Sequence, residues 1–144
     1  KEKQNSGMTN KTRCTIGDLE TTLSEKSKEF IKKATNKDLV LKPVLYNYFQ
    51  RFTLVNTQRS ERVTIDSCLS YKTNDTTKAL QNIVVIEVKQ EKQNVQTPIY
   101  KALKVTKIRT SSFSKYCIGV ASLVKGIKAN RFKELNLKIN KLTN

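Results

Sequence analysis

The chain has 144 residues, enough for one hydrophobic core, and carries 28 Lys and Arg against 12 Asp and Glu. The net charge of +16 predicts a polyanionic partner, whether nucleic acid, an anionic membrane surface or a phosphate chain. His is absent, which excludes the commonest general base and metal ligand, and three scattered Cys without a Cys-x-x-Cys pair argue against structural zinc. We expect free thiols in a reducing, cytoplasmic compartment and no transmembrane segment, because no apolar run is long enough to span a bilayer.

The first part of the chain is predicted to hold one short strand and one helix. Residues 11–16 alternate in character, which places Lys11 and Arg13 on one face of the predicted strand. Asp18 is a suitable N-cap for a helix over residues 19–34, whose apolar residues recur at helical spacing. We interpret that apolar stripe as packing surface.

Three longer strands are predicted in the middle of the chain, because aromatic and β-branched residues alternate there with polar residues, in segments separated by polar turns. They cover residues 45–55, 61–71 and 83–89, with polar loops at 56–60 and 72–78. In each strand one face is largely apolar, and we expect that face to pack against helices. The opposite faces carry the polar and charged side chains: Arg51 and Thr53, then Arg62, Thr64 and Asp66, then Glu87 and Lys89.

Helices are predicted to fill most of the remainder. Thr97-Pro98 is a strong start signal for a helix to about residue 107, because Pro favours the first helical position. A second helix is predicted over 111–124 and a third over 131–142, which has an apolar stripe. The fold class we predict is α+β: an antiparallel sheet with flanking helices.

The charged strand faces form a constellation if neighbouring strands pair antiparallel, because they then lie on one side of one sheet. That side would hold two carboxylates, Asp66 and Glu87, among five cations: Lys11, Arg13, Arg51, Arg62 and Lys89. Like charges at cross-strand distance repel, and a bound polyanion would offset that repulsion. Arg grips phosphate oxygens with two N–H groups at once, and a Glu suits a hard cation that bridges carboxylate and phosphate.

Four segments in this order resemble a known family. They are Arg51-Phe-Thr-Leu-Val, Glu61-Arg62-Val-Thr-Ile-Asp66, Ile86-Glu87-Val-Lys89 and Ser112-Phe-Ser-Lys115-Tyr. Together they are similar to the second half of a VTC domain of the bacterial type, the polyphosphate polymerase domain named after the vacuolar transporter chaperone. That domain belongs to the triphosphate tunnel metalloenzymes and is similar to the CYTH group, in which antiparallel strands close into a tunnel lined by Arg and Lys.

The resemblance implies a role for each residue at a matching position. Arg51, Arg62, Lys89 and Lys115 would be catalytic and would bind the substrate's phosphates, Ser114 would be a polar group beside them, and Glu87 would bind Mn²⁺ or Mg²⁺. Lys11 and Arg13 match less firmly, as further substrate-binding bases. The residues also allow a simpler interpretation, in which Arg62 and Asp66 form an ordinary surface ion pair and Lys115 is a solvated residue in the first turn of its helix.

By this resemblance, residues 1–144 would carry only part of an antiparallel tunnel-type sheet, without the family's first half and its Glu-x-Glu-x-Lys strand. We therefore expect residues 1–144 to be a single partial domain, the C-terminal part of a longer one, inactive alone and prone to self-association through an open sheet edge. The resemblance implies a polyphosphate polymerase that uses ATP and a polyphosphate chain. The alternatives are an inorganic triphosphatase on the same fold, or a non-catalytic module that binds polyphosphate or RNA. Nucleic acid is the less favoured partner, since few aromatic side chains, on which nucleobases could stack, lie among the predicted Lys and Arg residues.

Overall fold

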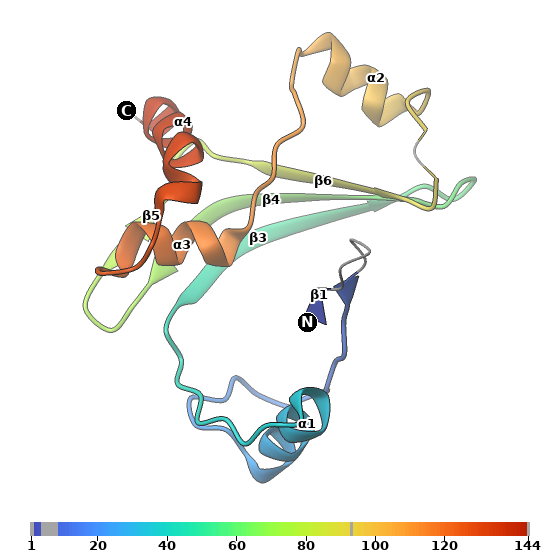
Figure 1. The fold of residues 1–144 in the computed structure, drawn as a ribbon. Helices are drawn as coiled ribbons and strands as arrows, with labels where there is room; N and C mark the ends of the chain where they lie inside the picture. The colour runs from blue at the N-terminus through green and yellow to red at the C-terminus, as the bar shows by residue number, and fades with distance from the viewer. Residues whose placement is uncertain (1, 4–8, 93, 144) are drawn as a thin grey trace. The chain divides into compact units, whose positions relative to one another are not determined.

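The computed structural model describes residues 2–3, 9–92 and 94–143, and the chain divides into two compact units, Lys1–Pro43 and Val44–Asn144 (Figure 1). The first unit contains two short antiparallel strands, β1 (Glu2–Lys3) and β2 (Thr9–Asn10), and the helix α1 (Glu25–Thr35). No helix in the described part of the chain is both long and apolar enough to cross a membrane.

Two predictions for the first unit are wrong. Residues 11–16 form no strand, because alternation alone does not make one where no neighbouring strand accepts and donates the backbone hydrogen bonds. The helix begins at Glu25 rather than at residue 19. Ser24 is its N-cap, and the Ser24 hydroxyl accepts a hydrogen bond from the Ser27 amide at 3.2 Å. The acidic Glu25 in the first turn complements the helix dipole, which favours this start over the one at Asp18.

The second unit is built around an open, antiparallel sheet of four strands, as predicted for an α+β fold. β4 is its centre: β3 pairs along one edge, and β5 and β6 pair with successive parts of the other edge. The predicted loop at 72–78 misses β5, a short strand that pairs with residues 70–72. The strand bounds are β3 (Tyr46–Val55), β4 (Glu61–Lys72), β5 (Thr77–Ala79) and β6 (Val85–Gln90).

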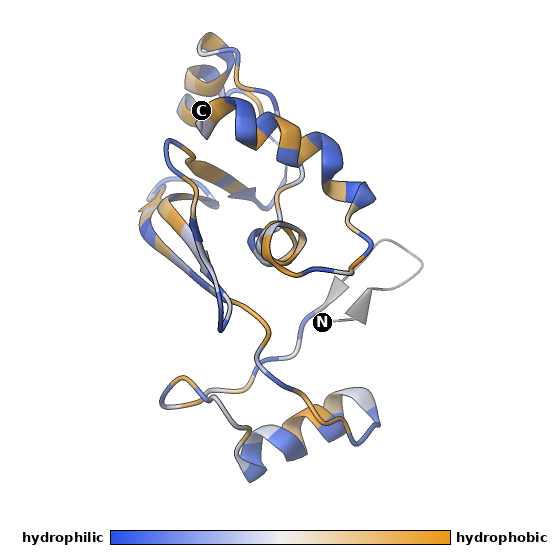
Figure 2. Cartoon of the chain, turned by 90° about the vertical axis from the view of Figure 1, so that its left-hand side faces the viewer, coloured by the Kyte–Doolittle hydropathy of each residue, from blue (hydrophilic) through white to orange (hydrophobic). Residues whose placement is uncertain are grey.

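Helices follow the sheet in the sequence. They are α2 (Pro98–Val105), α3 (Lys115–Leu123), a short 3₁₀ turn η1 (Asn130–Phe132) and α4 (Lys133–Thr143). The predicted start of α2 at Pro98 is confirmed, whereas α3 begins at Lys115 rather than at residue 111 because Ser114 caps it: its hydroxyl accepts a hydrogen bond from the Cys117 amide. Hydrophobic and hydrophilic residues alternate along the strands (Figure 2).

A β-bulge in β4 decides where the core forms. The register with β3 shifts between Tyr48 and Gln50, and Cys68, at φ 53°, is the extra residue on β4. Beyond the bulge, Leu69 and Tyr71 therefore lie on the same face as Asp66, and both are 1% exposed. They pack with buried residues of the 80–83 segment and of two helices: Leu80, Ile83, Ile118 and Ile139.

The face of the sheet that α3 covers is the opposite of the one predicted. We expected the apolar faces of the strands to pack on helices. Several of those side chains are instead exposed: Tyr48, Phe52, Leu54, Val84 and Ile86. The contacts of α3 are made on the Asp66 side, where Tyr71 and the partly buried Leu45 meet Gly119. The charged face is therefore covered by α3 at its apolar end and is open at its polar end.

Candidate functional site

The strand register brings the predicted charged residues onto one face of the sheet. Arg51 of β3 lies directly opposite Asp66 of β4, and Arg62 of β4 lies opposite Lys89 of β6. Glu87 pairs with Thr64, which lies on β4 between Arg62 and Asp66. The prediction that the polar faces of these three strands share one side of the sheet is confirmed. We call the set of Arg51, Arg62, Asp66, Glu87 and Lys89, with Lys115 from α3, the polar face.

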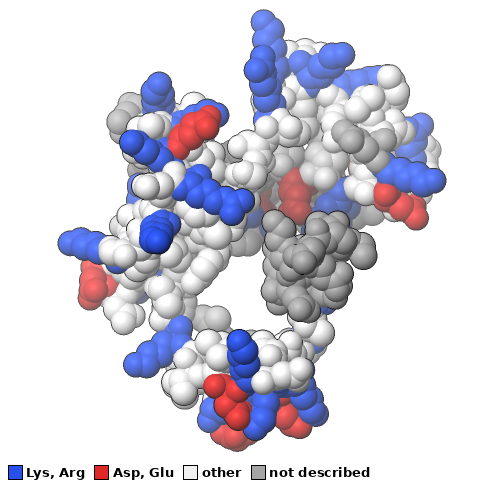
Figure 3. Space-filling model, viewed as in Figure 1, with Lys and Arg blue, Asp and Glu red and all other residues white. Residues whose placement is uncertain are grey.

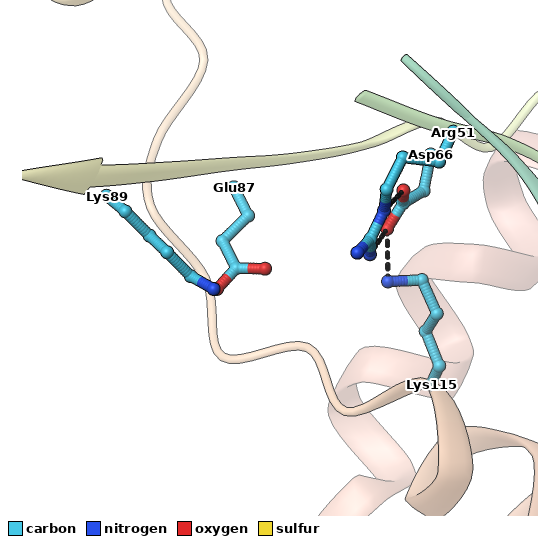
Figure 4. A network of polar contacts seen from close by, with 5 residues as sticks. All are labelled: Arg51, Asp66, Glu87, Lys89 and Lys115. Atoms are coloured by element: carbon cyan, nitrogen blue, oxygen red, sulfur yellow. Dashed lines mark hydrogen bonds and ion pairs between the residues drawn. The ribbon is translucent and has the colours of Figure 1, made fainter. Parts of the chain in front are cut away.

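Asp66 is the centre of the polar face. Its side chain is 1% exposed and accepts two hydrogen bonds from Arg51, from Nε to Oδ1 at 2.6 Å and from Nη2 to Oδ2 at 2.8 Å. The ammonium of Lys115 forms an ion pair with Oδ2 of the same carboxylate. Figure 4 shows Arg51 and Lys115 meeting Asp66 from two elements far apart in the sequence. The simpler interpretation, a surface ion pair of Arg62 with Asp66, is wrong, because Asp66 is buried and pairs with Arg51 and Lys115.

The ring of Phe49 lies beside both cations. The Arg51 guanidinium carbon is 5.1 Å from the ring centroid and the Lys115 ammonium is 4.7 Å from it. Both distances are within the range at which a cation is attracted by the ring's negative face. Phe49 therefore helps to hold two positive groups close together, which their mutual repulsion would otherwise oppose.

The contacts between Asp66, Arg51 and Lys115 shift the pKa values of Asp66 and Arg51. Hydrogen bonds from Arg51, together with Lys115, lower the pKa of Asp66 to about 2, against the opposing effect of burial. The same contact with Asp66 raises the pKa of Arg51, to which the Glu87 charge adds in the same direction. At neutral pH the cluster therefore carries two positive charges and one negative charge. The Arg51 side chain remains 42% exposed, so part of its guanidinium is accessible to a ligand.

Glu87 and Lys89 form the second contact of the polar face, an ion pair of 3.2 Å between side chains that are each about half exposed. Glu87 is an oxygen ligand of the type that Mg²⁺ and Mn²⁺ prefer. In the described residues, however, no group of three His, Cys, Asp or Glu is arranged to hold a metal. A single carboxylate can hold such an ion only where phosphate oxygens and water supply the remaining ligands.

The open end of the polar face is a hollow of 310 Å³ that Arg59, Arg62 and Lys89 line together with Glu61 and Glu91. Arg62 is exposed there. Arg59 was not among the predicted site residues. It lies in the turn before β4, where strand alternation does not indicate to which side of the sheet a side chain points. The three cations in one hollow can contact an extended anion.

The remaining predicted residues lie elsewhere. Ser114 is the N-cap of α3, with its hydroxyl engaged by the Cys117 amide, and is the residue immediately before Lys115. Lys11 and Arg13 are exposed residues of the first unit, outside any regular strand. Lys and Arg side chains are spread widely over the visible surface (Figure 3), so positive charge alone does not mark the site. The polar face differs because the strand register places Arg51, Arg62 and Lys89 on one side of the sheet, where α3 adds Lys115.

The model of the VTC domain family matches residues 1–124. No curated protein and no solved structure matches the chain.

Proposed function

Because this chain belongs to the VTC domain family, we propose that it supplies the phosphate-binding face of a polyphosphate polymerase. In the reaction, the γ-phosphoryl group of a nucleoside triphosphate passes to the end of a polyphosphate chain. One observation carries the proposal: Arg51, Arg62 and Lys89 lie on one sheet face, and α3 brings Lys115 to the same face. These cations follow one side of the sheet, along which a linear anion can extend.

Phosphoryl transfer requires little covalent chemistry from the protein, because catalysis comes mainly from positioning and from stabilising the charge on the phosphate oxygens. The absence of His is therefore compatible with this activity. Arg51 and Lys115 would bind phosphate at the inner, partly buried end of the polar face. Arg62 and Lys89 would bind it at the open end.

Glu87 would bind Mn²⁺ or Mg²⁺, since it is the exposed carboxylate of the polar face and Asp66 is already occupied by Arg51 and Lys115. When bound, such an ion neutralises phosphate charge and orients the phosphate groups. Further ligands would have to come from phosphate, water or residues other than those described.

The decisive experiment incubates the full-length protein that contains this chain with labelled ATP and Mn²⁺ and separates the products. Long-chain polyphosphate supports the polymerase. Release of free phosphate alone would show a triphosphatase, and retention of ligand without turnover would show a binding module; either result would overturn the proposal.

A matched pair of variants tests whether the polar face is responsible. Arg62→Ala removes a cation from the polar face, and Lys72→Ala removes an exposed cation of the same strand outside it. We expect loss of polymerase activity in the first variant and unchanged activity in the second.

A further inference from the structure

We propose that Asp66 is a positioning residue: it holds Arg51 and Lys115 in place for phosphate and stays bound to both when the phosphate chain is present. This inference rests on the proposed function. The alternative is that Asp66 occupies an anion site that phosphate must take over, so that ligand binding would displace the carboxylate. The two hypotheses differ in whether the contacts of Asp66 with Arg51 and Lys115 persist when phosphate is bound.

The geometry of Arg51 favours the positioning role. A guanidinium has five N–H groups in a fixed fork, and Asp66 takes one N–H of Nε and one of Nη2. Among the described residues, Nη1 has no hydrogen-bond partner, and the Arg51 side chain is 42% exposed. Lys115 likewise has three N–H groups. Arg51 can therefore bind phosphate without releasing Asp66, and the Lys115 ammonium, whose side chain is 18% exposed, has further N–H groups besides the contact with Asp66.

The burial of Asp66 opposes its displacement. The side chain is 1% exposed and comes from the central strand, with β3 on one side and β6 on the other. A carboxylate that lost both cations would remain buried without a partner, which is strongly unfavourable. With its pKa at about 2, Asp66 also stays charged at neutral pH, so protonation does not release the cations.

Asp66 additionally joins two elements. Arg51 lies on β3 and Lys115 is the first residue of α3, so the carboxylate sets the distance between a sheet cation and a helix cation. Phe49 borders both, but a ring face has no acceptor oxygens that could fix individual N–H groups, whereas the Asp66 oxygens accept from Nε and Nη2 of Arg51. Asp66 is thus the group that sets their orientation.

The variant experiment uses the full-length protein with ATP and Mn²⁺. Asp66→Asn keeps the size of the side chain but removes its charge, which leaves Arg51 and Lys115 without their shared partner. We expect kcat to fall at least tenfold, whereas the affinity for tripolyphosphate, measured by calorimetry without turnover, stays the same or rises because the net charge is one unit more positive. The control is Asp75→Asn, which makes the same charge change at an exposed loop position of the same unit and should alter neither quantity. A kcat within twofold of the parent protein in Asp66→Asn would overturn the inference.

A second measurement needs no variant that might misfold. The Nε–H resonance of Arg51 in the unaltered protein, assigned with Arg51→Lys, is expected to exchange slowly with water and to remain so when tripolyphosphate is added. Rapid exchange on addition would show that phosphate displaces Asp66, and would overturn the inference. A protein that neither binds tripolyphosphate nor turns over ATP would contradict the proposed function instead, while slow exchange without ligand would still report the Arg51 contact.

Discussion

Gly119 lies at the closest approach of α3 to the sheet, and replacing it with Ala should push the two apart. A Cβ at this position would lie 2.5 Å from Cδ2 of Leu45 and 2.6 Å from Cδ1 of Tyr71. Both distances are far below van der Waals contact. Tyr71 has no room to retreat, because it is 1% exposed within the core of the second unit.

The expected effect is the difference between two opposing contributions. Overpacking a filled core typically destabilises by about 1–3 kcal/mol, and the upper part of that range applies because two side chains are contacted below 3.0 Å. Ala is a better helix former than Gly by about 1 kcal/mol. We therefore expect Gly119→Ala to lower the free energy of unfolding by about 1–2 kcal/mol.

Urea unfolding followed by circular dichroism at 222 nm measures this effect, since the chain has no Trp to serve as a fluorescence probe. With a slope of about 2 kcal/mol per molar urea, the midpoint should fall by about 0.5–1 M. Gly17→Ala is the matched control, because no atom lies within 4 Å of the added Cβ there, and its midpoint should stay within about 0.25 M of the parent protein. A midpoint for Gly119→Ala equal to or above that of the parent protein would refute the packing of α3 on Tyr71.

Three further predictions concern the polar face. Glu87→Gln should abolish metal-dependent turnover and leave the circular dichroism spectrum unchanged; unaltered activity across a Mn²⁺ titration would exclude Glu87 as a metal ligand. The pKa of Asp66 falls from 3.8 to about 2 on folding, so its ion pairs stabilise the protein above about pH 4, and this contribution is lost as the pH falls towards 2. The contribution of these ion pairs to the free energy of unfolding is at most about 2 kcal/mol, and less because Arg51 is partly exposed. The difference in stability between the parent protein and Asp66→Asn, measured by urea unfolding, should therefore shrink as the pH falls from about 4 towards 2. Tripolyphosphate should raise the melting temperature of the protein, and Arg51→Ala, Arg62→Ala or Lys89→Ala should each reduce this increase. Tripolyphosphate should also displace bound RNA. Stronger retention of RNA than of polyphosphate at equal phosphate concentration would contradict this preference.

The strands of the second unit could be predicted closely from the sequence because their signals are local. Alternation of side chains and polar turns were sufficient to find β3, β4 and β6, and alternation also assigned Arg51, Arg62 and Glu87 to one face. Local signals were weaker elsewhere. β5 has three residues, too few to show a pattern, and it exists because β4 extends far enough beyond β6 to pair with it.

The partner of Lys115 could not be predicted, because it depends on how α3 is placed on the sheet. From the sequence, Lys115 was either a phosphate ligand or a solvated residue in a first turn. Its contact with Asp66 joins residues 49 positions apart in the chain. A helix that starts with a cation, just after a cap at Ser114, is compatible with either interpretation until the opposite carboxylate is located.

The β-bulge at Cys68 explains why the prediction of which sheet face is buried was wrong, although the polar strand faces were correctly predicted to share one side of the sheet. Strict alternation along β4 would place Cys68 and Ser70 on the face of Asp66, and that face would then be polar from end to end and a poor surface for a helix. The extra residue instead turns Leu69 and Tyr71 to that face, so one face is polar where Arg62 lies and apolar where Tyr71 lies. Packing of α3 on the apolar part places its first residue, Lys115, at the boundary with the polar part, beside Asp66. The bulge thus couples the core to the candidate phosphate site, because a change that shifts α3 on Tyr71 must also move Lys115.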